Sequence, residues 1–159
     1  MKLEERLGEL LRKKRMKLAV AESCTGGLIS SRITDIAGSS DYFEAGTVVY
    51  SNRAKQSFLS VPAEILEKYG AVSRETAEKM AEGVRAKTGA DIGLSVTGIA
   101  GPTGGSAEKP VGTVYVGLAT DQRLFFRKFQ FKGERLAIKE QTSNEALQFV
   151  IDLLEGNVA

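Results

Sequence analysis

The fold of this chain is decided at residues 18–27, which read Leu-Ala-Val-Ala-Glu-Ser-Cys-Thr-Gly-Gly. A short apolar run over residues 18–21 is followed by a turn rich in hydroxyl groups and glycine, and a helical pattern begins at Gly27. A turn between a strand and a helix directs free backbone N–H groups at a ligand, and the helix dipole favours negative charge there. The stretch therefore suits a phosphate, or the oxyanion that forms when a side chain attacks a carbonyl.

Length and composition indicate one domain over residues 1–159, with 42% apolar and 26% charged residues, as in soluble globular proteins. No apolar stretch approaches the roughly 20 residues that span a bilayer, so we expect no membrane association. The N-terminus lacks the apolar core of a signal peptide, and a single cysteine fits a reducing compartment. These features predict a cytoplasmic enzyme or binding domain.

The net charge is +2, and acidic and basic residues alternate along most of the chain. The one dense basic run covers residues 12–15, at the end of the first helical pattern, where cations interact favourably with the helix dipole. A nucleic-acid site would need a longer basic stripe with interleaved aromatic residues. We therefore expect no nucleic-acid partner.

Helical and strand patterns alternate along the chain and end in a hairpin. The last helix, after Gly133, is expected to bury Leu136 and Leu147. This order predicts an α/β fold: a three-layer α/β/α sandwich around a mixed, mostly parallel sheet, similar to anticodon-binding domains. The other expected helices cover residues 3–14, 27–36, 52–58, 62–70 and 73–88, and the expected strands cover residues 17–21, 45–50, 91–97, 111–120 and 124–131.

Three polar segments follow three of these strands. Ser23 follows the first, residues 50–55 follow the second, and the glycine-rich loop 98–106 follows the third. In open sheets of this kind, ligands bind beyond the carboxyl ends of parallel strands. The three segments are therefore expected to meet at one edge of the sheet and form a pocket.

The chain has no histidine, which excludes Ser-His-Asp and Cys-His catalysis. Lys55, if partly desolvated beside Arg53, would lose its proton near neutral pH and take the proton of Ser23, with Tyr50 orienting the lysine or relaying the proton. Three alternatives stay open at this point. Ser23 is a helix cap, Lys55 is a solvated helix residue, or Cys24 is the nucleophile, activated by a helix N-terminus.

Other site chemistries have weaker support in the sequence. No set of residues has the spacing of metal ligands, so we expect no metal and no other cofactor. The loop over residues 98–106 lacks the lysine of a Walker A motif, and it is either a phosphate-contacting loop or a flexible surface loop.

Six motifs, which together span most of the chain, stand out in the sequence. They are AESCTGG (residues 21–27), ITDIAGSS (33–40), VYSNRAK (49–55), GAVS (70–73), TGIAGP (97–102) and KPVGTV (109–114). In this order they resemble the C-terminal domain family of competence/damage-inducible protein A, whose stand-alone members are nicotinamide-nucleotide amidohydrolases.

The resemblance implies deamidation of nicotinamide mononucleotide, with Ser23 as nucleophile, Lys55 as base and Tyr50 in support. It implies that amides around Thr25, Gly26 and Gly27 hold the oxyanion. Rival interpretations are a non-catalytic module that binds pyridine nucleotides and, by fold analogy alone, an RNA-binding domain. A homo-oligomer is expected for so small a domain with open sheet edges. The residues implied to line the nucleotide site are Thr97, Gly98, Gly101, Gly104 and Gly105, with Arg135 or Lys139 meeting the phosphate.

Overall fold

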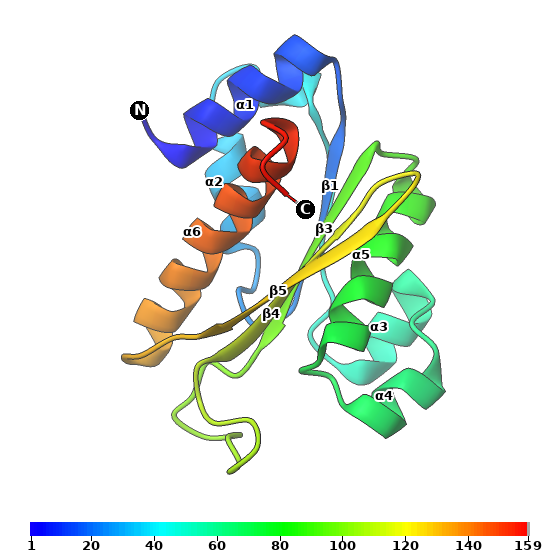
Figure 1. The fold of residues 1–159 in the computed structure, drawn as a ribbon, viewed down its shortest axis with the longest axis vertical. Coiled ribbons are helices and arrows are strands. Elements are labelled where there is room, and N and C mark those ends of the chain that lie inside the picture. The colour runs from blue at the N-terminus through cyan, green and yellow to red at the C-terminus, as the bar shows by residue number, and fades with distance from the viewer. Residues whose placement is uncertain (159) are drawn as a thin grey trace.

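Five strands form the middle layer of the protein: β1 (Leu18–Glu22), β2 (Phe43–Val48), β3 (Ile92–Gly98), β4 (Thr113–Ala119) and β5 (Leu124–Gln130). The structure is a computed structural model that describes residues 1–158. The strand order across the sheet is β2-β1-β3-β4-β5 (Figure 1). β1 pairs in parallel with both β2 and β3, and β4 pairs antiparallel with both β3 and β5. Four strands therefore run in one direction and β4 runs in the other, which confirms the predicted mixed, mostly parallel sheet.

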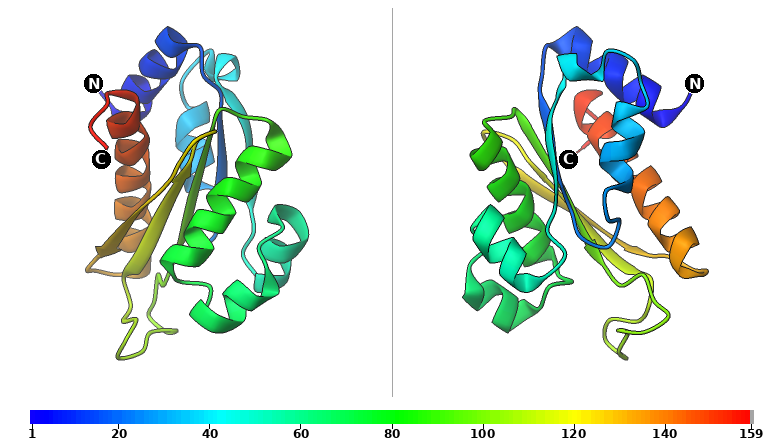
Figure 2. Two further views of the ribbon diagram at one scale, coloured as in Figure 1. Left: turned by 45° about the vertical axis from the view of Figure 1, so that its right-hand side comes forward. Right: turned by 180° about the vertical axis from the view of Figure 1, so that it is seen from behind.

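Helices cover both faces of this sheet and complete three layers (Figure 2). One face carries α1 (Leu3–Lys14), α2 (Leu28–Thr34) and α6 (Arg135–Leu154). The other carries α3 (Asn52–Leu59), α4 (Ala63–Tyr69) and α5 (Arg74–Thr88). The predicted α/β/α sandwich is thus the observed one. Within residues 1–158, no helix is long and apolar enough to cross a membrane.

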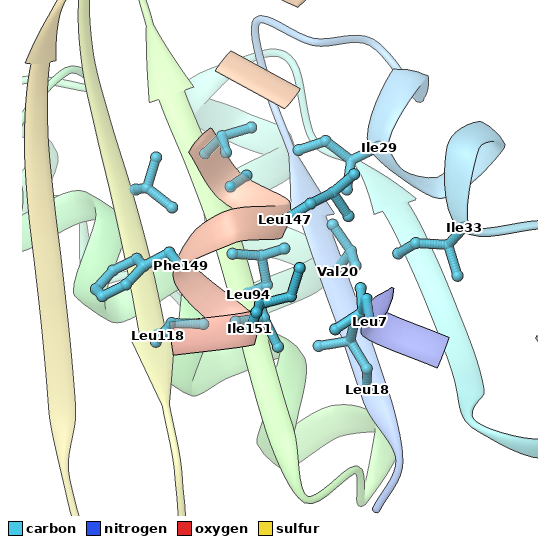
Figure 3. Close-up of a cluster of buried hydrophobic side chains, with 14 of the residues drawn as sticks. Leu7, Leu18, Val20, Ile29, Ile33, Leu94, Leu118, Leu147, Phe149 and Ile151 are labelled. Atoms are coloured by element: carbon cyan, nitrogen blue, oxygen red, sulfur yellow. The ribbon is translucent and has the colours of Figure 1, made fainter. Parts of the chain in front are cut away.

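The main apolar core lies between the sheet and the layer of α1, α2 and α6 (Figure 3). A second cluster, which includes Ala19, Ala21 and Met80, lies on the opposite face of the sheet. β1 is buried over its whole length, because its alternate side chains pack into the two clusters. Ser23, which directly follows β1, is therefore attached to a rigidly held strand. Labelled members of the main core are Leu7, Leu18, Val20, Ile29, Ile33, Leu94, Leu118, Leu147, Phe149 and Ile151.

Several predicted boundaries and one predicted burial differ from the structure. β2 ends at Val48 rather than at residue 50, and α2 ends at Thr34 rather than at residue 36. Gly38 has the predicted left-handed conformation, with φ of 83°, but it opens the 3-10 turn Ser39–Asp41 instead of closing α2. Leu136 is 75% exposed rather than buried, because it lies in the first turn of α6 and lines an open groove between α6 and the start of α1.

Candidate active site

Ser23 and Lys55 lie side by side in the interior of the protein. Ser23 directly follows the buried strand β1, and Lys55 lies in the first turn of α3, which begins after the N-cap residue Ser51. The Nζ atom of Lys55 donates a hydrogen bond of 3.0 Å to the Oγ atom of Ser23. The exposed fraction is 1% for Lys55 and 7% for Ser23. A lysine this deeply buried is rare without a special reason, which argues against the interpretation of a solvated helix residue.

Lys55 has three hydrogen-bond acceptors and, within residues 1–158, no carboxylate partner. Besides Ser23, its Nζ atom donates to the carbonyl oxygens of Val49 and Tyr50, each at 2.9 Å. Burial lowers the pKa of Lys55 from 10.5 to about 8, against a smaller opposing effect of the neighbouring Cys24. With a pKa near 8, about a tenth of the molecules carry a neutral lysine at pH 7.

The three acceptors also direct the lone pair that forms when Lys55 loses a proton. A neutral amine keeps two N–H bonds and gains one lone pair. The carbonyl oxygens of Val49 and Tyr50 accept only, so they retain the two N–H bonds. The lone pair then faces the hydroxyl of Ser23, which is the one partner able to donate. The arrangement is that of a base beside a nucleophile.

Within residues 1–158, the phenol of Tyr50 makes no hydrogen bond to Lys55, which meets the backbone carbonyl of Tyr50 instead. Tyr50 is 61% exposed, and its Oη atom accepts a hydrogen bond of 3.1 Å from Arg135. Arg135 also donates to the carbonyl of Gly101 at 2.7 Å. Because β2 ends two residues before Tyr50, the chain has already turned, and the backbone carbonyl of Tyr50 meets the lysine. Of the two predicted roles for Tyr50, its backbone carbonyl is placed to orient the lysine, and its phenol is not placed to relay the proton.

In the turn over residues 23–27, the two glycine amides are already hydrogen-bonded within the protein, whereas the resemblance implied that they hold an oxyanion. Gly26 and Gly27 have positive φ values of 61° and 106°, which favour glycine. The Gly26 amide donates to the carbonyl of Ser23, and the Gly27 amide donates to the carboxylate of Glu22. These two N–H groups are therefore not available to an oxyanion. Within residues 1–158, the backbone N–H groups of Cys24 and Thr25 donate to no other residue, so they remain as candidate donors.

Glu22, for which the sequence predicted no role, is completely buried at the end of β1. Its carboxylate accepts hydrogen bonds from the turn and from the start of α2. One signal for it was available in the sequence, namely an acidic residue directly after an apolar strand and directly before the serine. The Thr25 hydroxyl is one of its donors, at 2.7 Å, so this side chain supports the turn.

Cys24 is poorly suited to be the nucleophile. Its side chain is buried, and burial raises the pKa of the thiol from 9.0 to about 11, with a further increase from the charge of Glu22. The thiolate is the reactive form of cysteine, and at this pKa it is scarce near neutral pH. The alternative of a cysteine nucleophile therefore loses its physical basis.

A pocket of about 190 Å³ opens at the Ser23–Lys55 pair. Thr97 lines it, and its hydroxyl donates to the carbonyl of Ala71 at 2.8 Å, so this threonine holds one wall of the pocket. Gly101, Gly104 and Gly105 do not line it: the carbonyl of Gly101 accepts from Arg135, and Gly104 and Gly105 lie on an exposed loop. Its lining residues are Ser23, Cys24, Tyr50, Lys55, Ala71, Val72, Thr97, Gly98, Ala100 and Arg135.

Lys139 lies outside this lining but close to the turn. Its Nζ atom is 3.8 Å from the position that a Cβ atom on Gly26 would occupy. Lys139 makes no ion pair or side-chain hydrogen bond within the part of the chain that the structure describes. Over the same residues, 1–158, no group of three or more His, Cys, Asp or Glu is placed to hold a metal ion.

The fold and the site together define a three-layer α/β/α domain with a buried serine–lysine pair at the carboxyl ends of its parallel strands. Residues 1–154 match the family model of the CinA C-terminal domain, and the chain belongs to this family. A putative competence-damage inducible protein of Thermoanaerobacter pseudethanolicus is 51% identical over 97% of this chain and 37% of its own length. A CinA-like protein of Desulfotalea psychrophila is 54% identical over 91% of this chain and 35% of its own length.

Solved structures of the same superfamily share the fold. The competence/damage inducible protein CihA of Agrobacterium tumefaciens aligns with a TM-score of 0.90 at 39% identity, covering 96% of this chain and 95% of that one. A CinA superfamily protein of Klebsiella pneumoniae aligns with a TM-score of 0.94 at 30% identity, covering 97% and 96%. The curated relatives are longer, and this chain spans little more than a third of their length.

Proposed function

We propose that this protein is an amidohydrolase that converts nicotinamide mononucleotide and water into nicotinate mononucleotide and ammonia. The observation that carries the proposal is the 3.0 Å contact between the Nζ atom of Lys55 and the Oγ atom of Ser23. The pKa of this lysine, lowered to about 8, supports its use as a base. The choice of substrate rests on the resemblance of the motifs to nicotinamide-nucleotide amidohydrolases.

In the first half of the reaction, neutral Lys55 takes the hydroxyl proton of Ser23 as the Oγ atom attacks the carboxamide carbon. The carbonyl π electrons move to the oxygen and form a tetrahedral oxyanion. Donors aimed at this oxygen lower the barrier, because the negative charge develops only there. The unpaired N–H groups of Cys24 and Thr25, directly after the nucleophile in the chain, are the donors that we assign to this task.

In the second half, the oxyanion collapses and the C–N bond breaks. The ammonium group of Lys55 returns its proton to the departing nitrogen, so that ammonia leaves and an ester remains on Ser23. Lys55 is then neutral again and takes a proton from a water molecule, which attacks the ester carbon. The C–O bond to Ser23 breaks, Lys55 returns the proton to the serine oxygen, and the carboxylic acid product loses its own proton to water and is released as nicotinate.

The size of the pocket suits the reacting ring better than a whole nucleotide. At about 190 Å³ it is smaller than the roughly 300–1,000 Å³ of most ligand sites. Ala71, Val72 and Ala100 give it small apolar walls for a flat ring. The ribose and phosphate would then project outward past Arg135 toward the turn. Lys139, which has no acidic partner within residues 1–158, is the cation that we assign to the phosphate.

The test is ammonia release from nicotinamide mononucleotide, with nicotinamide, its riboside and the dinucleotide as competing substrates. We expect turnover of the mononucleotide by the wild type and by the Cys24→Ala variant, and none by Ser23→Ala. Full activity in Ser23→Ala would overturn the mechanism. Tight binding of the mononucleotide without ammonia release would instead support a non-catalytic binding module.

A further inference from the structure

Glu22 places a carboxylate next to the nucleophile without any cation bound to it. The residue has no exposed surface, and no ion pair to it exists within residues 1–158. Donors from four residues satisfy it instead. Its Oε1 atom accepts from the Thr25 hydroxyl at 2.7 Å, the Gly27 amide at 3.2 Å and the Ile29 amide at 3.0 Å. Its Oε2 atom accepts from the amide and the hydroxyl of Ser30, at 2.9 and 2.7 Å.

These bonds clamp the backbone on both sides of the reactive turn. Glu22 itself belongs to β1, which is buried and paired on both edges. Its five donors lie between three and eight residues further along the chain. Ser23 and the unpaired N–H groups of Cys24 and Thr25 therefore lie inside a loop that this one carboxylate closes. A displacement of about 1 Å in such a loop is enough to cost about 100-fold in rate.

We propose that Glu22 is a positioning residue for the attack by Ser23, holding the turn so that the Cys24 and Thr25 amides stay directed at the developing oxyanion. The proposal rests on the proposed function, since it takes Ser23 as the nucleophile. The side chain of Glu22 makes no hydrogen bond to Ser23 or Lys55 within residues 1–158 and does not line the pocket, so it acts through the backbone of the turn.

The substitution Glu22→Gln tests this role with almost no change in volume. It replaces one acceptor oxygen by an NH₂ donor. In one orientation this NH₂ faces the backbone N–H of Ser30, and in the other it faces those of Gly27 and Ile29. A backbone N–H cannot reverse its polarity, so both orientations set donor against donor. The turn must shift in either case.

The readout is the rate at which a fluorophosphonate modifies Ser23, measured by mass spectrometry. In this reaction the serine oxygen bonds to phosphorus, fluoride leaves and the serine proton passes to Lys55, so the rate requires no knowledge of the natural substrate. We expect Glu22→Gln to react about 100-fold more slowly than the wild type. In ammonia release, kcat should fall by a similar factor with KM nearly unchanged, because the lost interaction acts in the transition state.

Glu4→Gln is the matched control, since it neutralises another buried carboxylate, which accepts from Arg32 and not from the turn. It should react with the fluorophosphonate at the wild-type rate. If Glu22→Gln does not fold, Ser30→Ala removes a single donor to Glu22 and should slow the modification several-fold. Modification of Glu22→Gln or of folded Ser30→Ala at the wild-type rate would overturn the role of Glu22. Absence of modification in the wild type would instead overturn Ser23 as the nucleophile, and with it the proposed function.

Discussion

Lys55 is a buried basic residue and Arg32 a half-buried one, and they differ in what surrounds them. The Nη2 atom of Arg32 donates to the carboxylate of Glu4 at 2.9 Å. Its Nη1 atom donates to the side chains of Ser143 and Asn144, each at 2.7 Å. Lys55 meets a hydroxyl and two carbonyls, and no carboxylate.

The presence or absence of a carboxylate partner determines how each site is protonated. Burial alone would raise the pKa of Glu4, but the hydrogen bond and charge of Arg32 outweigh it, so the pKa of Glu4 is lowered. That pair stays charged and ties α2 to α1 and α6. At Lys55, burial acts with almost no compensation, and the pKa falls to about 8. Without a counter-ion, burial lowers the pKa of Lys55 and makes it a base. With Glu4 as counter-ion, Arg32 stays charged and forms an ion pair that connects two helices.

Exchanging the two kinds of cation gives the largest expected effect. Lys55→Arg keeps the positive charge but removes the base, because a guanidinium does not lose its proton in this pH range. We expect ammonia release to fall about a thousandfold. The reciprocal control is Arg32→Lys, which should retain near wild-type activity. Substantial activity in a folded Lys55→Arg protein would contradict the assignment of the base.

A carboxylate placed beside Lys55 should make it resemble Arg32. Cys24 lies within electrostatic reach of Lys55 but keeps its proton near neutral pH, so Cys24→Asp would place a charged carboxylate where the wild type has a neutral thiol. An opposite charge at this range raises the pKa of a lysine by about 1–3 units. Activity at pH 7 should fall at least about tenfold and recover as the pH rises. The control Cys24→Ser should keep the wild-type pH profile. An unshifted profile for Cys24→Asp would count against the comparison.

Removal of Glu4, the counter-ion of Arg32, should change stability alone, and it is the smallest of the expected effects. Glu4→Gln should lower the free energy of unfolding at pH 7 by about 1–3 kcal/mol, without a change in activity. Because the folded-state pKa of Glu4 lies below its ordinary value of 4.5, its contribution is present above that pH and is lost as the pH falls through the folded-state pKa. Urea titrations at pH 7 and near pH 3 should therefore show the difference between variant and wild type shrinking in acid. An equal difference at both pH values would exclude this linkage.

The layers, the sheet class and the meeting of Ser23 with Lys55 follow from sequence patterns. Strand and helix periodicities are local, and the rule for carboxyl strand ends converts them into a shared edge. These patterns could not predict that Tyr50 meets Lys55 through its backbone and not through its phenol, because this depends on β2 ending two residues earlier than expected, at Val48. They also could not predict that the amide of Gly27 is unavailable to an oxyanion, because this depends on its hydrogen bond to the Glu22 carboxylate. The exposure of Leu136 depends on how α6 packs, since its helical pattern alone does not distinguish it from its buried neighbours.

The central claim is that Lys55 is uncharged in a useful fraction of molecules near neutral pH. An NMR titration that follows the ¹³Cε signal of Lys55, assigned by its disappearance in Lys55→Arg, measures this directly. We predict a midpoint at about 8, in step with the rise of kcat/KM with pH. A midpoint at the ordinary lysine value of 10.5 would contradict the account.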